Sequence, residues 1–295
     1  MAKKAKNIVV LGSEGQLGKP LVSFLKQSKY NVTSFDIMAH GDEKLDLREK
    51  NELLNKAISD TDFVIFLAFD VGGSRYLQKM GKDFDFISNN AKMMNNVFTA
   101  IKECEGKPFV FATSTMVKSS DTSYGCLKKL GEYYTNSLNG LSVRLWNVYG
   151  TEDYGDKSHV ITDFVISARE KGEISCLTNG KERRQFLHVF DFCKAIEVII
   201  ENFNTIKKDL DEEELESIID ISSYEWTTIK QIAKEIGKQK NVPYTLSDKK
   251  DTFQNKDVKP DKSIFKKYWK PEISLKKGIR MIIEDLCKDS TEQNT

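Results

Sequence analysis

A glycine-rich segment, GSEGQLG at residues 12–18, constrains the fold of this chain more than any other feature of its sequence. An apolar, β-branched run over residues 7–11 precedes it, and residues 18–29 follow with apolar side chains at helical spacing. A strand, a glycine turn and a helix in this order predict a dinucleotide-binding unit. Gly12 would permit the tight turn, Gly15 would let backbone amides approach a pyrophosphate, and Gly18 would let the helix pack closely on the strand.

Strand and helix patterns alternate along the first half of the chain. Apolar runs predict further strands over residues 31–35, 63–68, 108–113 and 141–146, and periodic apolar residues predict helices over 48–59, 84–104 and 124–136. This alternation predicts an α/β fold, a doubly wound parallel sheet of the Rossmann type over residues 1–150, with 186–203 returning to it.

The second half of the chain has a looser pattern. A helix near residues 160–171, a short strand near 173–177 and a charged helical region around 209–216 predict a smaller α+β domain for the substrate over residues 151–287. The polar tail, 288–295, lacks periodic apolar residues and is expected to fray.

The composition excludes several classes of function. The 45 Lys and Arg residues balance 44 Asp and Glu, so no global field attracts nucleic acid. No apolar stretch is long enough to span a bilayer, and the basic start runs directly into a strand, so we expect a cytoplasmic protein without a membrane partner. The five cysteines are odd in number and lack paired spacing, which predicts reduced thiols and no metal site.

A carboxylate follows the second predicted strand, where a dinucleotide would present its adenosine ribose. Asp36 lies 18 residues beyond Gly18 and could accept hydrogen bonds from the ribose hydroxyls. Its charge and that of Glu14 would repel a 2'-phosphate, so NAD is favoured over NADP. The alternative is that Asp36 is an ordinary carboxylate at a strand end.

Tyr124 and Lys128 stand at positions i and i+4, on one face of a predicted helix. A free tyrosine has a pKa near ~10, but an adjacent ammonium and a positive nicotinamide ring both favour the phenolate. Tyr124 could then exchange a proton with a sugar hydroxyl during hydride transfer, while Ser114 would hydrogen-bond the same oxygen. Such a pair is common on surface helices, so its weight comes from its place in a dinucleotide-binding domain.

At these residues the chain resembles the extended short-chain dehydrogenase/reductase family, the NAD-dependent epimerase/dehydratases that act on nucleotide sugars. The resemblance extends over nearly the whole chain. Its motifs are GSEGQLG, Asp46-Leu47, FVFATSTMV, YGCLK, RLWNVYG, GKERRQFLHVFD and the closing segment PDKSIFKKYWKPEISLKKGI.

The resemblance implies tightly bound NAD, a nucleotide-sugar substrate and a homodimer or higher homo-oligomer formed through helices 84–104 and 124–136. It implies that Ser114, Tyr124 and Lys128 are catalytic. The implied cofactor contacts are Gly12, Gly15, Gln16, Leu17, Gly18, Asp36, Asp46, Leu47, Leu67, Ala68 and Asn90, together with Tyr124 and Lys128. Among these, Asp46 and Leu47 would contact adenine. The implied substrate contacts are Val71, Gly72, Gly73, Ser114, Thr115, Asn147, His159, Val160 and Arg184. Arg184 would bind the nucleotide diphosphate, a role that the adjacent Arg183 could also take.

The chain departs from the family just after Ser114. Members that dehydrate the sugar have two acidic groups where this chain has Thr115 and Met116, and members similar to GDP-fucose synthase have a cysteine in place of Met116. A thioether cannot transfer protons, which favours plain redox chemistry at C4 of the sugar.

Three reactions remain open: a 4-dehydrogenase, a 4-epimerase, and a reductase of a 4-keto sugar, which Asp36 disfavours if NADPH is required. Residues 71–73, Val-Gly-Gly, are similar to the loop of GDP-sugar members, so a GDP-hexose or GDP-heptose is a candidate substrate; equally, the two glycines could simply turn the chain. A non-catalytic NAD-binding regulator is the alternative from another class.

Overall fold

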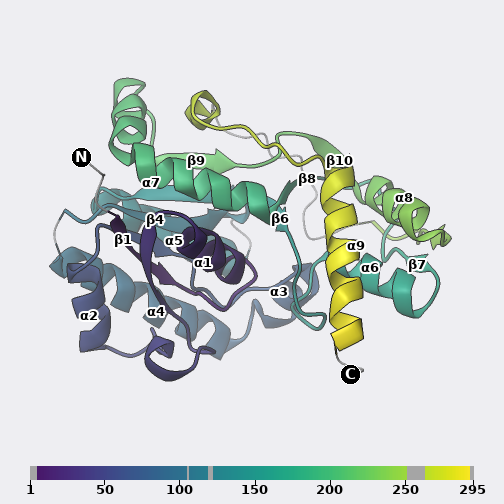
Figure 1. Cartoon of the computed structure of the whole chain (residues 1–295), viewed down its shortest axis with the longest axis horizontal. Coiled ribbons are helices and arrows are strands. Elements are labelled where there is room, and N and C mark those ends of the chain that lie inside the picture. The colour runs from purple at the N-terminus through teal and green to yellow at the C-terminus, as the bar shows by residue number, and fades with distance from the viewer. Residues whose placement is uncertain (1–4, 105, 119–121, 251–262, 293–295) are drawn as a thin grey trace.

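A six-stranded parallel sheet forms the centre of the larger domain (Figure 1). The computed structural model describes residues 5–104, 106–118, 122–250 and 263–292. All neighbouring strands are parallel, in the order β2-β1-β3-β4-β5-β9. From β1 the chain adds β2 on one side, and it then adds β3, β4, β5 and β9 on the other side. This change of side confirms the predicted doubly wound sheet. The strands are β1 (Lys6–Leu11), β2 (Tyr30–Phe35), β3 (Phe63–Phe66), β4 (Phe109–Ser114), β5 (Leu141–Leu145) and β9 (Ile218–Ile221).

Helices cover both faces of this sheet because its strands are apolar on both sides. On β1, Ile8 and Val10 belong to the core shared with α1 (Gly18–Gln27) and α7 (Val189–Glu212). The alternate residues Val9 and Leu11 belong to the core on the opposite face. That second core includes residues of α2 (Glu52–Ser59), α4 (Phe84–Glu103) and α5 (Ser123–Ser137).

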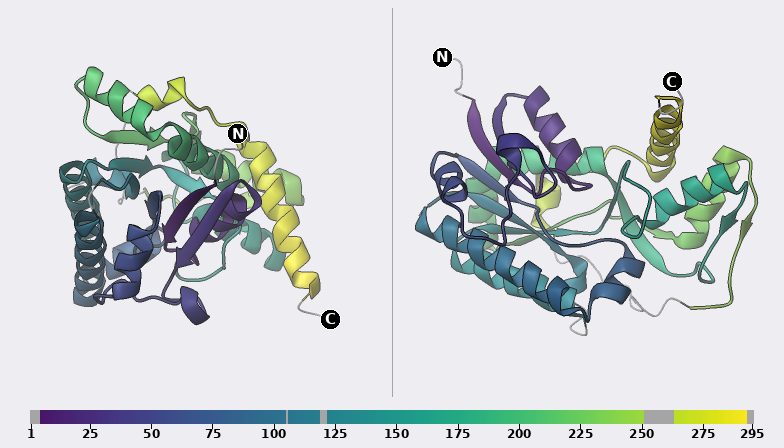
Figure 2. Two further views of the ribbon diagram at one scale, coloured as in Figure 1. Left: turned by 60° about the vertical axis from the view of Figure 1, so that its left-hand side comes forward. Right: turned by 90° about the horizontal axis from the view of Figure 1, so that it is seen from below.

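A smaller α+β unit follows the sheet and lies at its right-hand side in Figure 1. It contains a three-stranded sheet in the order β10-β8-β6 and a two-stranded sheet of β11 and β7. Its strands are β6 (Asn147–Tyr149), β7 (Ile174–Ser175), β8 (Arg183–His188), β10 (Trp226–Thr228) and β11 (Tyr244–Thr245). Its helices α6 (Val160–Glu170), α8 (Ile229–Lys240) and α9 (Leu275–Glu292) share a third core, and Figure 2 shows their grouping from two other sides.

Short helical elements complete the fold: α3 (Ser74–Met80) and the 3-10 turns η1 (Gly41–Glu43), η2 (Thr115–Lys118) and η3 (Ile264–Lys267). Two of these lie at the carboxyl edge of the sheet. α3 belongs to the connection between β3 and α4, and η2 directly follows β4. Both therefore stand where a doubly wound sheet binds its ligand.

The structure differs from the predicted elements at four points. The helix predicted over 48–59 begins at Glu52, because the Asn51 side chain caps it by accepting a hydrogen bond from the Leu53 amide. The charged region 209–216 is helical only to Glu212, the end of α7. β9 lies within the range assigned to the second domain but completes the main sheet. α9 continues to Glu292, so the tail expected to fray is helical at first; residues 293–295 lie outside the described residues.

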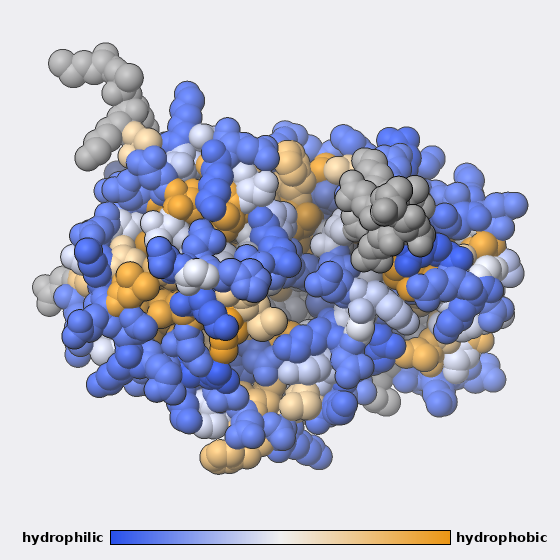
Figure 3. Space-filling view, turned by 60° about the horizontal axis from the view of Figure 1, so that its bottom comes forward, coloured by the Kyte–Doolittle hydropathy of each residue, from blue (hydrophilic) through white to orange (hydrophobic). Residues whose placement is uncertain are grey.

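Among the described residues, no helix is long and apolar enough to cross a membrane. The face in Figure 3 is largely hydrophilic, with apolar side chains in small separate groups. Four cysteines have described side chains, and these four form no disulfide: Cys104, Cys126, Cys176 and Cys193.

Candidate active site

The glycine loop has the geometry that its sequence predicts. Gly12 has φ +94°, and a Cβ there would lie 2.5 Å from the Ala68 amide nitrogen, so only glycine fits between β1 and β3. A Cβ at Gly18 would lie 2.0 Å from the Gly12 carbonyl oxygen, so Gly18 permits the start of α1 to approach the loop. At Gly15 a Cβ would meet only that oxygen, at 3.6 Å. Contacts within the chain therefore do not require glycine at position 15. A ligand that approaches the backbone closely would require it.

This loop also contains an unpaired polar atom. The Ser13 hydroxyl is buried and has no hydrogen-bond partner among the described residues. Buried polar groups are rarely left unpaired unless a ligand or water completes them. With the open space at Gly15 and the amino end of α1, this hydroxyl fits the pyrophosphate of a dinucleotide. Two other loop residues were predicted to contact the cofactor: Leu17 packs against the core and Gln16 is half-buried.

Asp36 lies beside the glycine loop, at the end of β2. Its Oδ2 accepts a hydrogen bond from the Glu14 amide at 3.0 Å, and its Oδ1 accepts one from the Met38 amide at 2.9 Å. Two carboxylate oxygens have about four acceptor positions, so ribose hydroxyls can still bind. The residue thus joins the loop to β2, and its predicted ribose contact stays a prediction.

The pair predicted to contact adenine has other partners in this structure. Asp46 forms a two-pronged ion pair with Arg48, with contacts of 2.8 Å from Nε and 2.6 Å from Nη2, and this pairing lowers the pKa of the Asp46 carboxyl. The Leu47 side chain is buried in the core, and its carbonyl accepts a hydrogen bond from Asn96 at 3.1 Å. Any adenine contact by Leu47 would therefore involve its backbone.

The chain after β3 is held by Asn90 of α4. The Asn90 oxygen accepts a hydrogen bond from the Asp70 amide at 2.8 Å, and its nitrogen donates to the carbonyls of Asp70 and Phe86. Asn90 is fully buried, so it acts on a cofactor only through this loop. Leu67 and Ala68 come just before, where their amides bind the Leu11 carbonyl beside Gly12. They border the crevice between β1 and β3.

Ser114, Tyr124 and Lys128 come together at the carboxyl end of β4. The Ser114 hydroxyl lies close enough to the Tyr124 phenol to lower its pKa. The Lys128 Nζ donates to the Ala112 carbonyl at 2.7 Å and lies 5.9 Å from the centre of the Tyr124 ring. The structure thus brings together the three residues that the sequence predicts to be catalytic.

Burial sets the protonation of this group. Tyr124 is 8% exposed and Lys128 is 3% exposed. Burial raises the pKa of Tyr124 to about 12, although the contact with Ser114 acts in the opposite direction. Burial also lowers the pKa of Lys128 well below its ordinary value. The sequence-based expectation that a neighbouring ammonium favours the phenolate is therefore not met in this state, because both groups have lost their water.

Two apolar side chains contribute to this burial, and sequence reasoning missed one of them, Phe69. Phe69 lies under Lys128, with Nζ 3.6 Å from the ring centre, and its ring meets that of Tyr124 edge-on at 5.7 Å. Met116 is buried in the same cluster as Tyr124. Only the position of Phe69, directly after β3 and Ala68, could have indicated a contact with the site.

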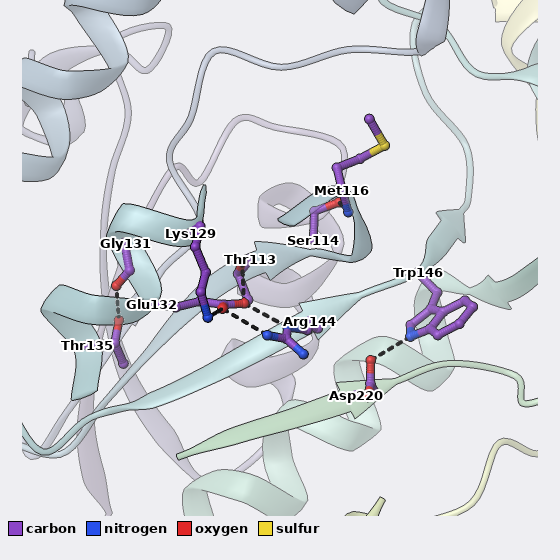
Figure 4. Close-up of polar contacts among 10 residues, drawn as sticks. All are labelled: Thr113, Ser114, Met116, Lys129, Gly131, Glu132, Thr135, Arg144, Trp146 and Asp220. Atoms are coloured by element: carbon purple, nitrogen blue, oxygen red, sulfur yellow. Dashed lines mark hydrogen bonds and ion pairs between the residues drawn. The ribbon is translucent and has the colours of Figure 1, made fainter. Parts of the chain in front are cut away.

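Thr115 and Met116 begin the η2 turn, directly after Ser114. Figure 4 shows Ser114 and Met116 at the end of β4. Thr115 is buried, and the Met116 amide donates to the Ser114 hydroxyl at 3.2 Å. Met116 therefore presents an apolar side chain beside Tyr124. A contact between Thr115 and substrate stays a prediction.

The Val-Gly-Gly loop packs against the second domain. A Cβ at Gly73 would lie 2.4 Å from the Ser158 carbonyl oxygen, and one at Gly72 would lie 3.0 Å from Lys157. The Gly73 amide donates to the Lys157 carbonyl at 2.9 Å. Close approach of two backbones thus explains both glycines. This explanation adds to the two roles that the sequence left open, a sugar-binding loop and a simple turn. Val71 is 37% exposed and remains available to a ligand.

Ion pairs fasten the same contact. The Lys157 Nζ lies 2.7 Å from an Asp70 carboxylate oxygen, and the Tyr76 hydroxyl donates to the same oxygen at 2.8 Å. Arg75 of α3 pairs with Asp163 of α6 at 2.7 Å. The loop after β3 and the start of α6 are therefore joined and form one wall of the site.

His159 precedes α6 in this wall and is held by a carboxylate. Its Nδ1 lies 2.8 Å from Glu152, and its amide donates to the other oxygen of Glu152 at 2.8 Å. The ring is partly exposed while the Glu152 side chain is 8% exposed. This arrangement leaves Nε2 for another partner, as a substrate contact requires. Val160, the first residue of α6, is half-buried.

Adjacent arginines on β8 point to opposite faces of its sheet. The Arg183 guanidinium lies over the Trp226 ring, 5.5 Å from its centre. Arg184 is half-buried and donates to the Arg183 carbonyl at 2.8 Å. The two arginines therefore lie on opposite faces, and Arg183 already contacts Trp226. This difference favours Arg184 for the predicted diphosphate contact. Asn147 begins β6, the neighbour of β8, and is half-buried.

Comparisons with known proteins agree with this geometry. The sequence profile of the "NAD dependent epimerase/dehydratase family" matches residues 8–211. A curated dTDP-4-dehydro-6-deoxyglucose reductase of Escherichia coli is 23% identical over 332 residues, which cover 98% of this chain and 100% of that protein.

Two solved structures share the fold. A UDP-glucose 4-epimerase of Thermotoga maritima, solved with UDP-glucose, has a TM-score of 0.76 and 18% identity over 96% of this chain and 99% of its own. A GDP-6-OMe-4-keto-L-xylo-heptose reductase of C. jejuni has a TM-score of 0.78 and 20% identity over 97% and 99%. The profile match covers most of the chain and confirms the predicted resemblance. The chain belongs to the NAD dependent epimerase/dehydratase family, and is thus an NAD-dependent enzyme of the extended short-chain dehydrogenase/reductase type.

Proposed function

We propose that this enzyme transfers a hydride between NAD and C4 of a nucleotide-activated sugar, as a 4-dehydrogenase or 4-epimerase. The observation that carries the proposal is the grouping of Ser114, Tyr124 and Lys128 beside an apolar Met116. With Ser114 beside Tyr124 and an apolar side chain at Met116, this grouping suits chemistry at one carbon. A GDP-hexose or GDP-heptose is the substrate suggested by the Val-Gly-Gly loop.

Each residue has a distinct part in this reaction. NAD, when bound, accepts or returns the hydride. Tyr124 takes or gives the proton of the sugar hydroxyl, and the Ser114 hydroxyl binds the same oxygen. Lys128 holds the nicotinamide ribose with an N–H donor that its contact with the Ala112 carbonyl does not use. Arg184 and Asn147 hold the diphosphate, and Val71, His159 and Val160 bind the sugar side.

One observation favours a second candidate, a reductase of a 4-keto sugar. Burial raises the pKa of Tyr124 to about 12, so the phenol holds its proton more firmly than a free tyrosine, and the protonated phenol is the form that donates a proton to a carbonyl oxygen. The similarity to two reductases agrees with this direction. In the oxidative direction, the phenolate must instead be produced by the charge of the bound cofactor.

The test begins with the purified protein. Denaturation should release bound NAD or NADH, after which GDP-, UDP-, dTDP- and CDP-sugars, and their 4-keto forms, are screened for a change in nicotinamide absorbance. Net NADH formation indicates a dehydrogenase, net NADH consumption a reductase, and a changed sugar with no net change an epimerase.

Tyr124→Phe should lower turnover by about a hundredfold or more. Tyr133→Phe is the matched control, because Tyr133 lies on the same helix but is 62% exposed and should keep full activity. Near-normal turnover of Tyr124→Phe would refute the catalytic assignment. Binding of NAD with no reaction of any sugar would favour a non-catalytic regulator.

A further inference from the structure

A buried carboxylate lies on the same helix as Tyr124 and Lys128. The Glu132 side chain is 1% exposed, and each of its oxygens accepts two hydrogen bonds (Figure 4). Oε1 accepts from Thr113 at 3.1 Å and from the Arg144 Nε at 2.7 Å. Oε2 accepts from the Arg144 Nη2 at 2.9 Å and from Lys129 at 3.2 Å. The acceptor positions of this carboxylate are therefore filled.

The strand partners of Glu132 are neighbours in the sheet. Thr113 of β4 and Arg144 of β5 are paired in the parallel register, and both are buried. Ser114 is the next residue after Thr113, so its backbone position depends on where the Thr113 hydroxyl is held. One carboxylate thus fixes the end of β4 from which Ser114 extends.

The helix partners of Glu132 lie on its own face of α5. Tyr124, Lys128 and Glu132 are spaced by four residues each, so they form one row along the helix. A Cβ at Gly131 would lie 2.3 Å from the Phe111 ring, so glycine lets α5 approach β4 closely at this level. A shift of Glu132 along or around the helix axis would therefore move Tyr124 relative to Ser114.

The energetics favour a role in geometry. Desolvation of a buried ion pair offsets most of its attraction, and apolar residues of similar volume often stabilise a fold as well or better. What an apolar contact lacks is direction, since a two-pronged arginine fixes both distance and orientation. We propose that Glu132, Arg144 and Thr113 are positioning residues that set the separation and angle of the Ser114 and Tyr124 hydroxyls. The proposal rests on the catalytic roles proposed above for those two residues.

The first test removes one hydroxyl. Thr113→Val should lower kcat by roughly tenfold with little change in KM, because misplacement by less than an ångström is costly in a reaction. Loss of the aligned Ser114 contact should also displace the pH profile of kcat to higher pH, since that contact lowers the pKa of Tyr124. Thr113→Ser keeps the hydroxyl and should restore both values. Thr135→Val is the control, because the equally buried Thr135 bonds only the Gly131 carbonyl.

The second test removes the ion pair while keeping the fold. The double variant Glu132→Leu/Arg144→Met should match the thermal stability and NAD affinity of the parent but lose kcat roughly tenfold or more, with the same alkaline displacement. Unchanged kcat and pH profile in Thr113→Val and in a folded double variant overturns the proposal. Measuring Tyr124→Phe alongside separates the two inferences: if it alone is inactive, only the positioning role fails, and if it is active, the catalytic assignment fails.

Discussion

The buried phenol of Tyr124 predicts a specific loss of stability in alkali. Its pKa is raised from 10.0 to about 12 because burial penalises the phenolate. In the unfolded chain the same phenol titrates at its ordinary value. Below that value both states bind the proton, so the group has no effect on the pH dependence. Above it the unfolded chain releases the proton first, and folding loses stability until the folded pKa is passed.

The magnitude follows from the displacement of the pKa. One pKa unit corresponds to about 1.4 kcal/mol, so the wild type should lose about 1.3 kcal/mol of unfolding free energy through Tyr124 between about pH 9 and about pH 11. Tyr124→Phe lacks the titrating group and should not show this part of the loss. Other buried tyrosines, such as Tyr149 and Tyr224, titrate in both proteins, so their contributions cancel in the difference.

The assay is denaturant unfolding of the wild type and of Tyr124→Phe at a series of pH values, each followed by far-ultraviolet circular dichroism. The expected result is a difference in unfolding free energy that changes by the stated amount in favour of the variant as the pH rises. Ser114→Ala should extend the loss to higher pH, above about pH 11, because it removes the contact that lowers the pKa of folded Tyr124. Parallel curves for the wild type and Tyr124→Phe would show that the phenol is not held in its neutral form.

Three further predictions concern the cofactor loop, the buried amine and the surface helices. Gly12→Ala should lower the unfolding free energy by roughly 3 kcal/mol, from backbone strain and overpacking, whereas Gly15→Ala should keep the parent midpoint and weaken NAD binding measured by calorimetry. Lys128→Met should abolish turnover yet raise the unfolding free energy by on the order of 1 kcal/mol, since it replaces a desolvated amine; a lower thermal midpoint would contradict this. Leu130→Glu, on an exposed apolar position of α5, should convert the predicted dimer to a monomer in sedimentation, and an unchanged mass would place the interface elsewhere.

The sequence predicts the parts of the fold that depend on local patterns. The glycine loop can be predicted because the backbone atoms that leave no room for a side chain at Gly12 and Gly18 lie in the loop itself or at the end of the neighbouring strand. The row of Tyr124 and Lys128 follows from helical periodicity alone. β9 was not predicted because its four residues, Ile218–Ile221, follow a charged segment and pair with a strand more than 70 residues earlier in the chain.

The contacts between distant segments could not be read in the same way. Gly72 and Gly73 look like a turn or a ligand loop, yet their requirement for glycine comes from residues 157–158 of the other domain. Glu132 looks like an ordinary solvated position on a charged helix until Arg144 and Thr113 are brought beneath it by the sheet register. The sequence around a charged helix residue does not indicate whether its side chain meets a buried partner or water.

The same limit explains why the sequence predicts the identity of the catalytic group and misjudges its charge. Spacing establishes that an amine and a phenol are close, and in water their proximity would favour the phenolate. Whether water is present depends on Phe69 and Met116, which come from the ends of two other strands. Burial disfavours the charged form of both groups, since it raises the pKa of Tyr124 and lowers that of Lys128. In the oxidative direction, the charge of the bound cofactor must then favour the Tyr124 phenolate. What the protein can prepare before the cofactor binds is the geometry of Ser114 and Tyr124.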